Sequence, residues 1–279
     1  MSTPLVSVLM TAYNREKYIA AAIESVLAST YANFELIITD DRSADKTVDI
    51  ARAYAAKDQR VKVFLNEQNL GDYPNRNKAA SHATGEYLKY VDADDAIYPW
   101  GLEILVNCME KFPAAGYGLC SLSPDKQQPF PFQLSPVEAY RYQYFGPGLF
   151  HKAPLSSIIR RSAFENAKGF SPIRMAGDYD MWHRLSTVVP VVLMPHGIVW
   201  YRQHDSQEMN VYHKFEQVYN QVCYTALNNA GCPLTSKEIN TVKQRYQSRY
   251  GRKALKNLAR LNFSAARRYW KLKKEFSPE

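Results

Sequence analysis

Apolar runs alternate with helical patterns along the first third of the chain. Four short runs have the length and composition of strands buried in a sheet, at residues 5–10, 34–39, 61–65 and 87–91. Between them, apolar residues recur at helical spacing over residues 18–27, 46–57 and 75–82. Strand and helix follow one another four times, which predicts right-handed crossovers and an α/β fold with a mostly parallel central sheet flanked by helices.

Polar residues stand directly after three of these runs, where parallel α/β sheets bind their ligands. They are residues 11–14, 40–43 and 92–95. Side chains alternate along an extended segment, so Asp92 and Asp94 point the same way and can share Mg²⁺ or Mn²⁺, which could hold a diphosphate. A second interpretation is that Asp94 and Asp95 cap the helix that begins near Pro99.

The second half of the chain has fewer regular patterns. Residues 116–154 are rich in Pro, Tyr and Phe, and they predict loops with one short helix at 136–144. Asp178 and Asp180 open a further helix, and His204 follows a predicted strand. The strands predicted in this half lie at 191–194 and 198–201.

Composition narrows the class of protein. With 279 residues, 46% of them apolar, the chain can bury a full core. Its four cysteines show no C-x-x-C spacing, which predicts reduced thiols and neither zinc nor disulfides. An uncharged apolar run of about 18 residues is missing, and a strand follows the N-terminus directly, so a cytoplasmic location is expected. The sequence contains no G-x-G-x-x-G and no G-x-x-x-x-G-K-[ST], so a phosphate would have to be held by metal and side chains.

Positive charge is concentrated near the C-terminus. Lys and Arg outnumber Asp and Glu by 35 to 27, and residues 243–274 contain twelve of the basic residues and no acidic one. Without that segment the net charge is 8 − 12 = −4, so no nucleic-acid partner is expected for the protein as a whole. Two basic amphipathic helices are predicted there. They could rest on anionic lipid or pack as a solvated pair on the catalytic domain.

Together these motifs resemble the family 2 glycosyltransferases, an inverting group with the GT-A fold. The matching text lies at residues 6–14, 34–45, 69–77, 85–95, 177–182 and 201–204. The resemblance implies a catalytic domain over residues 1–205 that binds a nucleotide sugar, and it leaves residues 206–279 as a helical, basic C-terminal extension.

The resemblance also implies roles for single residues. Thr11, Tyr13 and Asn14 would lie against the nucleotide, and a carboxylate of Asp40-Asp41, preferably Asp41, would accept a hydrogen bond from uracil. The alternative for these two aspartates is that they form a turn with Ser43. The diphosphate side would comprise Asp92 toward the ribose and metal, Asp94 as ligand of Mn²⁺ or Mg²⁺, Asp95 as an alternative ligand, and Arg76 as a positive charge. Arg76 could equally be a solvated residue on a helix face.

Asp178 is the predicted catalytic base, because it would sit at a helix N-terminus facing the same cleft. Its alternative role is simply to cap that helix. Asp180 is expected to be structural or to hold the donor sugar or the acceptor. His204 would approach the cation as a further ligand when residues 205–210 fold over the nucleotide as a lid.

The leading hypothesis is a metal-dependent inverting glycosyltransferase. It would move a sugar from a nucleoside diphosphate donor, preferably a UDP-sugar, to a saccharide or lipid-linked acceptor in bacterial surface polysaccharide synthesis. The basic tail would place it at the inner face of the plasma membrane. Two alternatives are a sugar-phosphate nucleotidyltransferase, which would be expected to carry a Gly-rich N-terminal loop, and a non-catalytic protein that binds membrane or nucleic acid through the tail.

Overall fold

One large sheet organises the molecule, and its first half is parallel. The computed structural model describes residues 3–204 and 215–276. Within them the sheet has eight strands in the order β3-β2-β1-β4-β8-β6-β9-β7. The first four strands of that order are mutually parallel, with Val6 of β1 beside Phe34 of β2 and Tyr87 of β4. They are β1 (Val6–Ala12), β2 (Phe34–Asp40), β3 (Val61–Leu65) and β4 (Tyr87–Tyr90).

The two faces of these strands belong to separate cores, as the period of two along a strand requires. Leu9 and Ile37 pack with helix α3 (Asp72–Ser81), whereas Val8 and Leu36 pack with α1 (Ile19–Leu27). On the α1 face lie also α2 (Thr47–Ala55) and α4 (Gly101–Glu110). Both faces are therefore covered, which explains why these strands are continuous apolar runs in the sequence.

The second half of the sheet is mixed, with short strands. Antiparallel pairs join β4 to β8, β8 to β6 and β9 to β7, while β6 and β9 are parallel. The strands are β6 (Tyr117–Leu119), β7 (Phe132–Leu134), β8 (Ser157–Arg160) and β9 (Val191–Leu193). Four of the seven neighbouring pairs in the sheet are parallel, so the predicted mostly parallel α/β fold is confirmed. Outside this sheet, β5 (Ala96–Ile97) pairs with β10 (Val199–Trp200).

The loop region predicted at 116–154 contains more structure than expected. It holds β6, β7 and one helix, α5 (Pro136–Phe145). Ser135 and Glu138 form a capping box at the start of α5, which satisfies backbone N–H groups that the first turn leaves unpaired. Beyond it come the 3₁₀ turn η1 (Pro154–Ser156), α6 (Arg161–Asn166) and α7 (Gly177–Val188).

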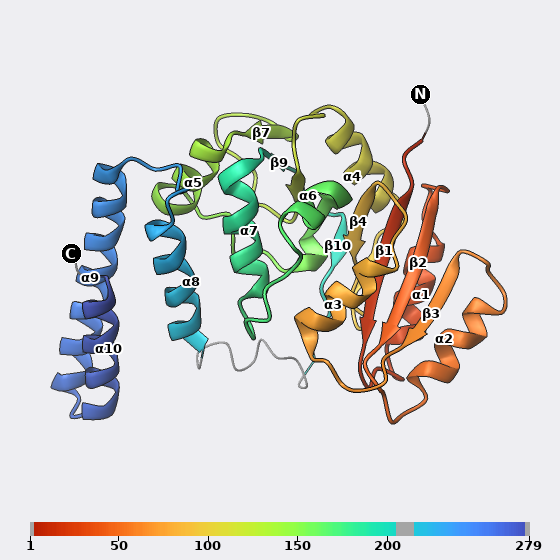
Figure 1. The fold of residues 1–279 in the computed structure, drawn as a ribbon, viewed down its shortest axis with the longest axis horizontal. Coiled ribbons are helices and arrows are strands. Elements are labelled where there is room, and N and C mark those ends of the chain that lie inside the picture. Colours follow the sequence, from red (N-terminus) through yellow and green to blue (C-terminus); the bar gives the residue numbers. More distant parts are fainter. Residues whose placement is uncertain (1–2, 205–214, 277–279) are drawn as a thin grey trace.

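Three further helices follow in the described residues, and they lie on the α3 face of the sheet (Figure 1). They are α8 (Glu216–Asn228), α9 (Ser236–Ala259) and α10 (Phe263–Glu275). Val222, Tyr250 and Phe276 belong to the same core cluster as Trp182 of α7, so the predicted C-terminal helices are confirmed and they pack on the rest of the protein. The predicted boundary after residue 205 adjoins residues outside the described ranges. No helix of the described residues combines the length and the apolar content that crossing a membrane would need.

Candidate active site

A pocket of about 590 Å³ opens beyond the carboxyl ends of β1, β2 and β4. Segments from across the sequence meet there because the parallel strands end at the same edge of the sheet. Nine predicted site residues line it: Thr11, Tyr13, Asn14, Asp41, Arg76, Asp92, Asp94, Asp95 and Asp178. Several aspartates make the lining acidic, and α7 contributes Asp178 to it.

The two aspartates after β2 have different environments. Asp40 accepts hydrogen bonds from the backbone N–H and the hydroxyl of Ser43, at 2.8 and 2.5 Å, so it forms the turn. Asp41 lines the pocket and accepts bonds from the backbone N–H groups of Leu70 and Gly71, at 2.8 and 2.9 Å. Its Oδ1 also accepts a bond from Asn66. Since Oδ2 holds a single partner among these bonds, it retains a lone pair for a further donor, such as the N–H of a base.

Asn14 supports this loop from β1. Its backbone N–H donates to Ser43 Oγ at 2.8 Å and its side-chain oxygen accepts from Ala44 N–H at 2.9 Å. The residue has φ +52, a left-handed conformation that Asn tolerates better than most residues. It does not cap α1, which begins at Ile19. Asn14 therefore joins the loops after β1 and β2 and shapes the pocket wall that Tyr13 shares.

Arg76 and Asp92 form a bidentate ion pair in the pocket wall. The two guanidinium nitrogens lie 2.6 and 3.0 Å from the carboxylate oxygens of Asp92, and Arg76 also donates to Asp72 at 2.8 Å. Only 7% of Arg76 is exposed, so the alternative of a solvated residue on a helix face is wrong. Thr11 donates a long bond of 3.4 Å to Asp92 Oδ1. The charge of Asp92 is thus largely balanced within the protein.

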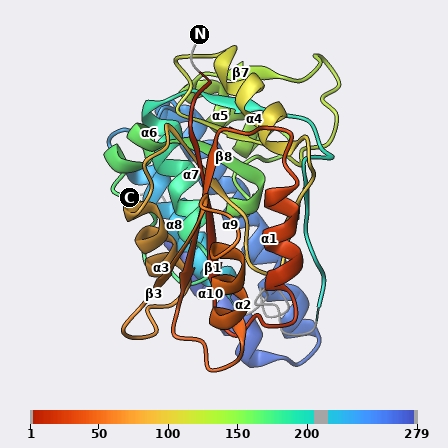
Figure 2. The ribbon, with the colours of Figure 1, turned by 90° about the vertical axis from the view of Figure 1, so that its right-hand side faces the viewer.

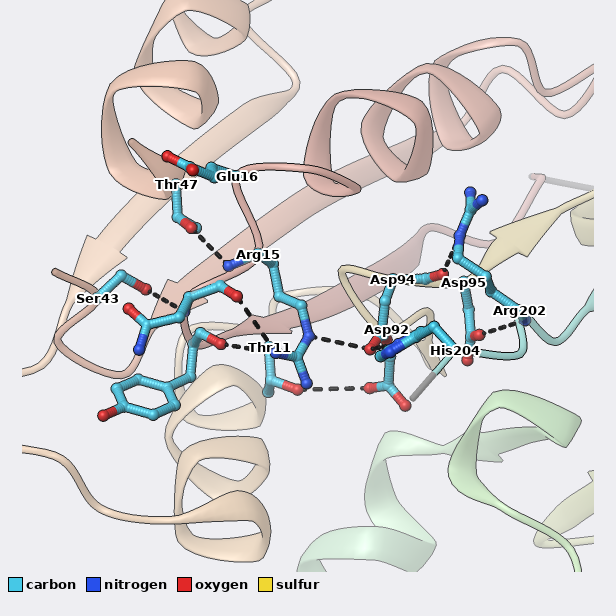
Figure 3. Close-up of polar contacts among 12 residues, drawn as sticks. Thr11, Arg15, Glu16, Ser43, Thr47, Asp92, Asp94, Asp95, Arg202 and His204 are labelled. Carbon is cyan, nitrogen blue, oxygen red and sulfur yellow. Dashed lines mark hydrogen bonds and ion pairs between the residues drawn. The ribbon is translucent and has the colours of Figure 1, made fainter. Parts of the chain in front are cut away.

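Asp94 is the carboxylate with the most suitable neighbours for a cation. Its Oδ2 lies 2.9 Å from Arg15 Nε and 3.0 Å from His204 Nε2 (Figure 3). A carboxylate oxygen and an imidazole nitrogen this close together could both ligate Mn²⁺ or Mg²⁺ in place of their mutual contact, since such ions take one or two protein ligands and fill the remaining positions with phosphate oxygens and water. Among residues 3–204 and 215–276, no group of three His, Cys, Asp or Glu could hold a metal. The site therefore fits a metal only together with a diphosphate.

Arg15 was not predicted from the sequence. It follows Tyr13 and Asn14, but its partner Asp94 is 79 positions later, so no local pattern links the two. The same guanidinium donates to the backbone carbonyls of Tyr13 and Asn14 at 3.0 and 3.2 Å. The positive charge of Arg15 therefore neutralises the carboxylate of Asp94 in this structure.

Asp95 is less suited to bind metal than Asp94. It is buried, and its Oδ1 accepts from the backbone N–H of Arg202 at 2.9 Å. Burial, and then the neighbouring charge of Asp92, raise the pKa of Asp95 to about 8. Through its bond with the Arg202 N–H, this carboxyl holds the segment that carries His204. The helix-cap alternative is wrong for both residues, because α4 begins at Gly101 without a side-chain cap.

Asp178 lies in the first turn of α7, whose start packs tightly on α3. A Cβ on Gly177 would stand 2.7 Å from the Tyr73 ring, so glycine allows this close approach. Burial raises the pKa of Asp178 to about 7, although hydrogen bonds from the Tyr179 backbone N–H and with the Tyr73 side chain oppose the shift. The helix has no side-chain cap, so the capping alternative is not what the structure contains. A carboxyl with a pKa near 7 is suited to accept a proton at neutral pH.

Asp180 was expected either to be structural or to hold the donor sugar or the acceptor, and its contacts in the structure are structural. Its Oδ2 accepts from Ser171 at 2.5 Å and from Arg184 at 2.7 Å, and it is not among the described residues that line the pocket. Two residues along a helix correspond to a rotation of about 200°, so Asp180 leaves the pocket when Asp178 faces it. The predicted lid at residues 205–210 lies outside the described residues.

Comparison with known proteins gives the same family as the motifs. Residues 7–167 match the model of glycosyl transferase family 2. The putative glycosyltransferase EpsE of Bacillus subtilis (strain 168) is 34% identical over 194 residues, which cover 66% of this chain and 67% of EpsE. An Escherichia coli protein, UDP-Glc:alpha-D-GlcNAc-diphosphoundecaprenol beta-1,3-glucosyltransferase WfgD, is 39% identical over 111 residues, 40% of this chain and 43% of WfgD.

Two solved structures share the fold. S. aureus TarS 1–349 in complex with UDP-GlcNAc superposes with a TM-score of 0.67 at 19% identity, covering 86% of this chain and 70% of that one. The mannosyltransferase PcManGT from Pyrobaculum calidifontis in complex with GDP-Man and Mn²⁺ gives 0.60 at 16% identity, covering 99% and 85%. The motif order, the pocket at the strand ends and the match over residues 7–167 agree, and the chain belongs to glycosyl transferase family 2.

Proposed function

We propose that this protein transfers a sugar from a UDP-sugar to an acceptor hydroxyl, with metal dependence and with inversion at the anomeric carbon. One observation carries the proposal: a carboxyl with a pKa of about 7, Asp178, lines the same pocket as Asp94. His204 is not among the described residues that line this pocket, but its Nε2 contacts Asp94 Oδ2 from the neighbouring hollow that Tyr18 and Trp200 also line. Residues 1–205 would perform the transfer, and residues 206–279 would form the extension. The family assignment favours this reaction over the nucleotidyltransferase and over a protein without catalysis.

The uridine would lie between Tyr13 and Asp41. Tyr13 is 48% exposed in the pocket, so its ring is available to stack on a base. Asp41 Oδ2 would accept the N–H of uracil. The names of WfgD and of the TarS complex, which mention UDP-Glc and UDP-GlcNAc, support a UDP donor, whereas PcManGT is named with GDP-Man. Binding of GDP in place of UDP would therefore redirect the donor assignment and leave the transfer intact.

Asp94 and His204 would hold Mn²⁺ or Mg²⁺ on the diphosphate. The bound ion supplies Lewis-acid stabilisation of the negative charge that develops on the departing diphosphate. Arg15 would exchange its contact with Asp94 for one with a phosphate oxygen, because both are anionic oxygen acceptors within reach of the same guanidinium. Arg76 would stay paired with Asp92 and would hold this part of the pocket wall in place.

Asp178 would act as the general base. As the acceptor hydroxyl oxygen bonds to the anomeric carbon, Asp178 takes the hydroxyl proton, and the bond from that carbon to the diphosphate oxygen breaks with its electron pair leaving on UDP. Asp178 afterwards releases the proton to solvent. A single displacement from the face opposite the leaving group inverts the anomeric carbon.

The acceptor is proposed to be a saccharide, either free or linked to a lipid, in the synthesis of a bacterial surface polysaccharide. WfgD is named for a diphosphoundecaprenol acceptor, which supports an acceptor linked to a lipid. A lipid-linked acceptor would require the pocket to work at the inner face of the membrane.

The test measures UDP release from UDP-glucose and UDP-N-acetylglucosamine with Mn²⁺ and a bacterial lipid extract as acceptor source. We expect Asp178→Asn to lose turnover by about 100-fold or more while its UDP affinity stays within about twofold, because a general base contributes to the chemical step alone. Asp49→Asn on the exposed first turn of α2 is the matched control and should behave as wild type. An active Asp178→Asn variant would remove the residue from this role, and release of pyrophosphate from UTP would indicate a nucleotidyltransferase.

A further inference from the structure

The end of the α9–α10 hairpin exposes apolar side chains. We call Leu255, Leu258, Leu261 and Phe263 the hairpin tip; their exposed fractions are 56%, 44%, 75% and 63%. They surround the turn between the end of α9 at Ala259 and the start of α10 at Phe263. Other residues of the two helices, such as Tyr250 and Leu272, are fully buried, so the hairpin is well packed except at this end.

Folding does not account for the leucine in the middle of the tip. Leu261 has φ +57, a left-handed conformation in which glycine is favoured and a branched apolar residue is disfavoured. The turn therefore carries a large side chain in an unfavourable backbone conformation, and three quarters of that side chain is exposed to solvent. A partner outside the chain that contacts the tip would explain both features.

Positive charge surrounds the tip. Residues 243–274 hold twelve basic residues and no acidic one. Within the described part of the chain, Arg249 and Lys253 pair with Glu216, while no carboxylate contacts Lys256, Arg260, Arg267 or Arg268. These four lie within a few positions of the turn. A partner surface that is apolar inside and anionic at its rim would match this pattern, and an anionic lipid bilayer has that structure.

The hairpin tip lies on the same side of the molecule as the pocket. In Figure 1, α9 descends to the lower edge, where its turn into α10 is found, and β1 and β2 also run downward to their carboxyl ends. Figure 2, turned by 90°, again places the α9–α10 turn at the lower edge together with the loops that follow β2 and β3. A flat surface that touches the tip would therefore face the pocket side of the protein.

We infer that the hairpin tip is a membrane-docking surface, which inserts its apolar side chains at the headgroup boundary of an anionic bilayer while the surrounding Lys and Arg contact the headgroups. Trp270, 38% exposed and two turns along α10, suits the interface region. The docking itself needs only the tip. Its purpose, to bring the pocket to a lipid-linked acceptor, rests on the function proposed above.

The experiment is cosedimentation of the full chain with vesicles of phosphatidylglycerol and phosphatidylcholine, against vesicles of phosphatidylcholine alone. We expect binding to the anionic vesicles only. Leu261→Gly should weaken binding by at least about threefold, since it removes one inserted side chain, and should melt at the same or a higher temperature because glycine relieves the positive φ. Replacing Arg267 and Arg268 by Gln should weaken binding by about 25-fold, which is about fivefold for each charge.

Val188→Ser is the matched control. Val188 is 73% exposed at the far end of α7, so its loss should leave vesicle binding unchanged. UDP affinity, measured on every variant, should stay constant, so failure of docking is distinguishable from failure of the proposed transfer. The proposal would be overturned if the wild-type protein did not bind anionic vesicles, or if the Leu261→Gly variant bound them as the wild type does. A dimer that the tip variants convert to monomer, without vesicle binding, would instead identify the tip as a self-association surface.

Discussion

Replacing Asp178 with Asn should make the protein more stable at high pH while removing its activity. The folded-state pKa of about 7 lies above the ordinary aspartate value of 3.8, so the folded protein binds more protons than the unfolded chain between those pH values. The free energy of unfolding therefore falls as pH rises through this window, and above about pH 7 the folded protein carries the whole cost of an ionised, partly buried carboxylate. Asn does not titrate and avoids that cost.

The magnitude follows from the size of the shift. Roughly three pKa units at about 1.36 kcal/mol each give a ceiling of about 4 kcal/mol. Asp178 is only partly buried at the pocket wall, so solvent screening reduces the expected value to about 1–2 kcal/mol. Most of this difference should appear between pH 5 and pH 8. The Tyr179 N–H bond to the side-chain oxygen persists in Asn, and the Tyr73 hydroxyl, which bonds to Asp178, can rotate to accept from the new amide N–H₂.

The assay is urea unfolding of wild type and Asp178→Asn in metal-free buffer at both pH values. The stability difference in favour of the variant should grow from pH 5 to pH 8. Asp180→Asn on the same helix is the control, because it breaks the ion pair with Arg184 and should lose stability at both pH values. An Asp178→Asn variant whose stability relative to wild type does not change with pH would refute the reasoning about burial.

Two further changes test the packing and the nucleotide loop. Gly85→Ala should lower the free energy of unfolding by about 2–3 kcal/mol, because its Cβ would meet Leu5 O and Ser7 N at 2.7 Å. The control Gly251→Ala, within α9 and with no neighbour closer than 3.7 Å, should gain up to about 1 kcal/mol in the same urea titration; equal effects of the two would contradict the clash. Asp41→Asn should weaken UDP binding in calorimetry by about tenfold. In the variant an amide N–H₂ would face one of the backbone N–H groups that now donate to the carboxylate oxygens of Asp41. Unchanged affinity would remove Asp41 from the nucleotide site.

Elements with a clear local pattern could be predicted from the sequence, whereas elements that depend on distant partners could not. The runs that became β1, β2 and β4 are buried on both faces, and all four runs are short, apolar and bounded by polar turns, so length and hydrophobicity were sufficient to locate them. Strands β6 and β7 have three residues each, too few for a visible pattern, and they exist because β8 and β9 pair with them from distant positions. Helix α8 was also missed, since its buried residues Val222, Cys223 and Leu227 are scattered among polar ones.

The candidate site was also predicted only in part. The sequence identifies which side chains gather, because the carboxyl ends of parallel strands meet at one edge. It does not identify which charges neutralise one another. Arg15 and His204 contact Asp94 from 79 and 110 positions away, and Arg76 reaches Asp92 from the neighbouring helix. Spacing alone left Asp180 as either a structural residue or a ligand of the donor sugar or the acceptor, and in the structure its carboxylate accepts from Arg184.

The central claim is that Asp94 gathers a divalent ion that holds the donor diphosphate. Calorimetric titration of UDP into the protein with and without Mn²⁺ tests it most directly. The account predicts that Mn²⁺ strengthens UDP binding by at least about tenfold in the wild type and has no effect in Asp94→Ala, because the variant lacks the carboxylate ligand. Equal UDP affinity with and without Mn²⁺ in the wild type, or an Asp94→Ala variant that still responds to the metal, would contradict it.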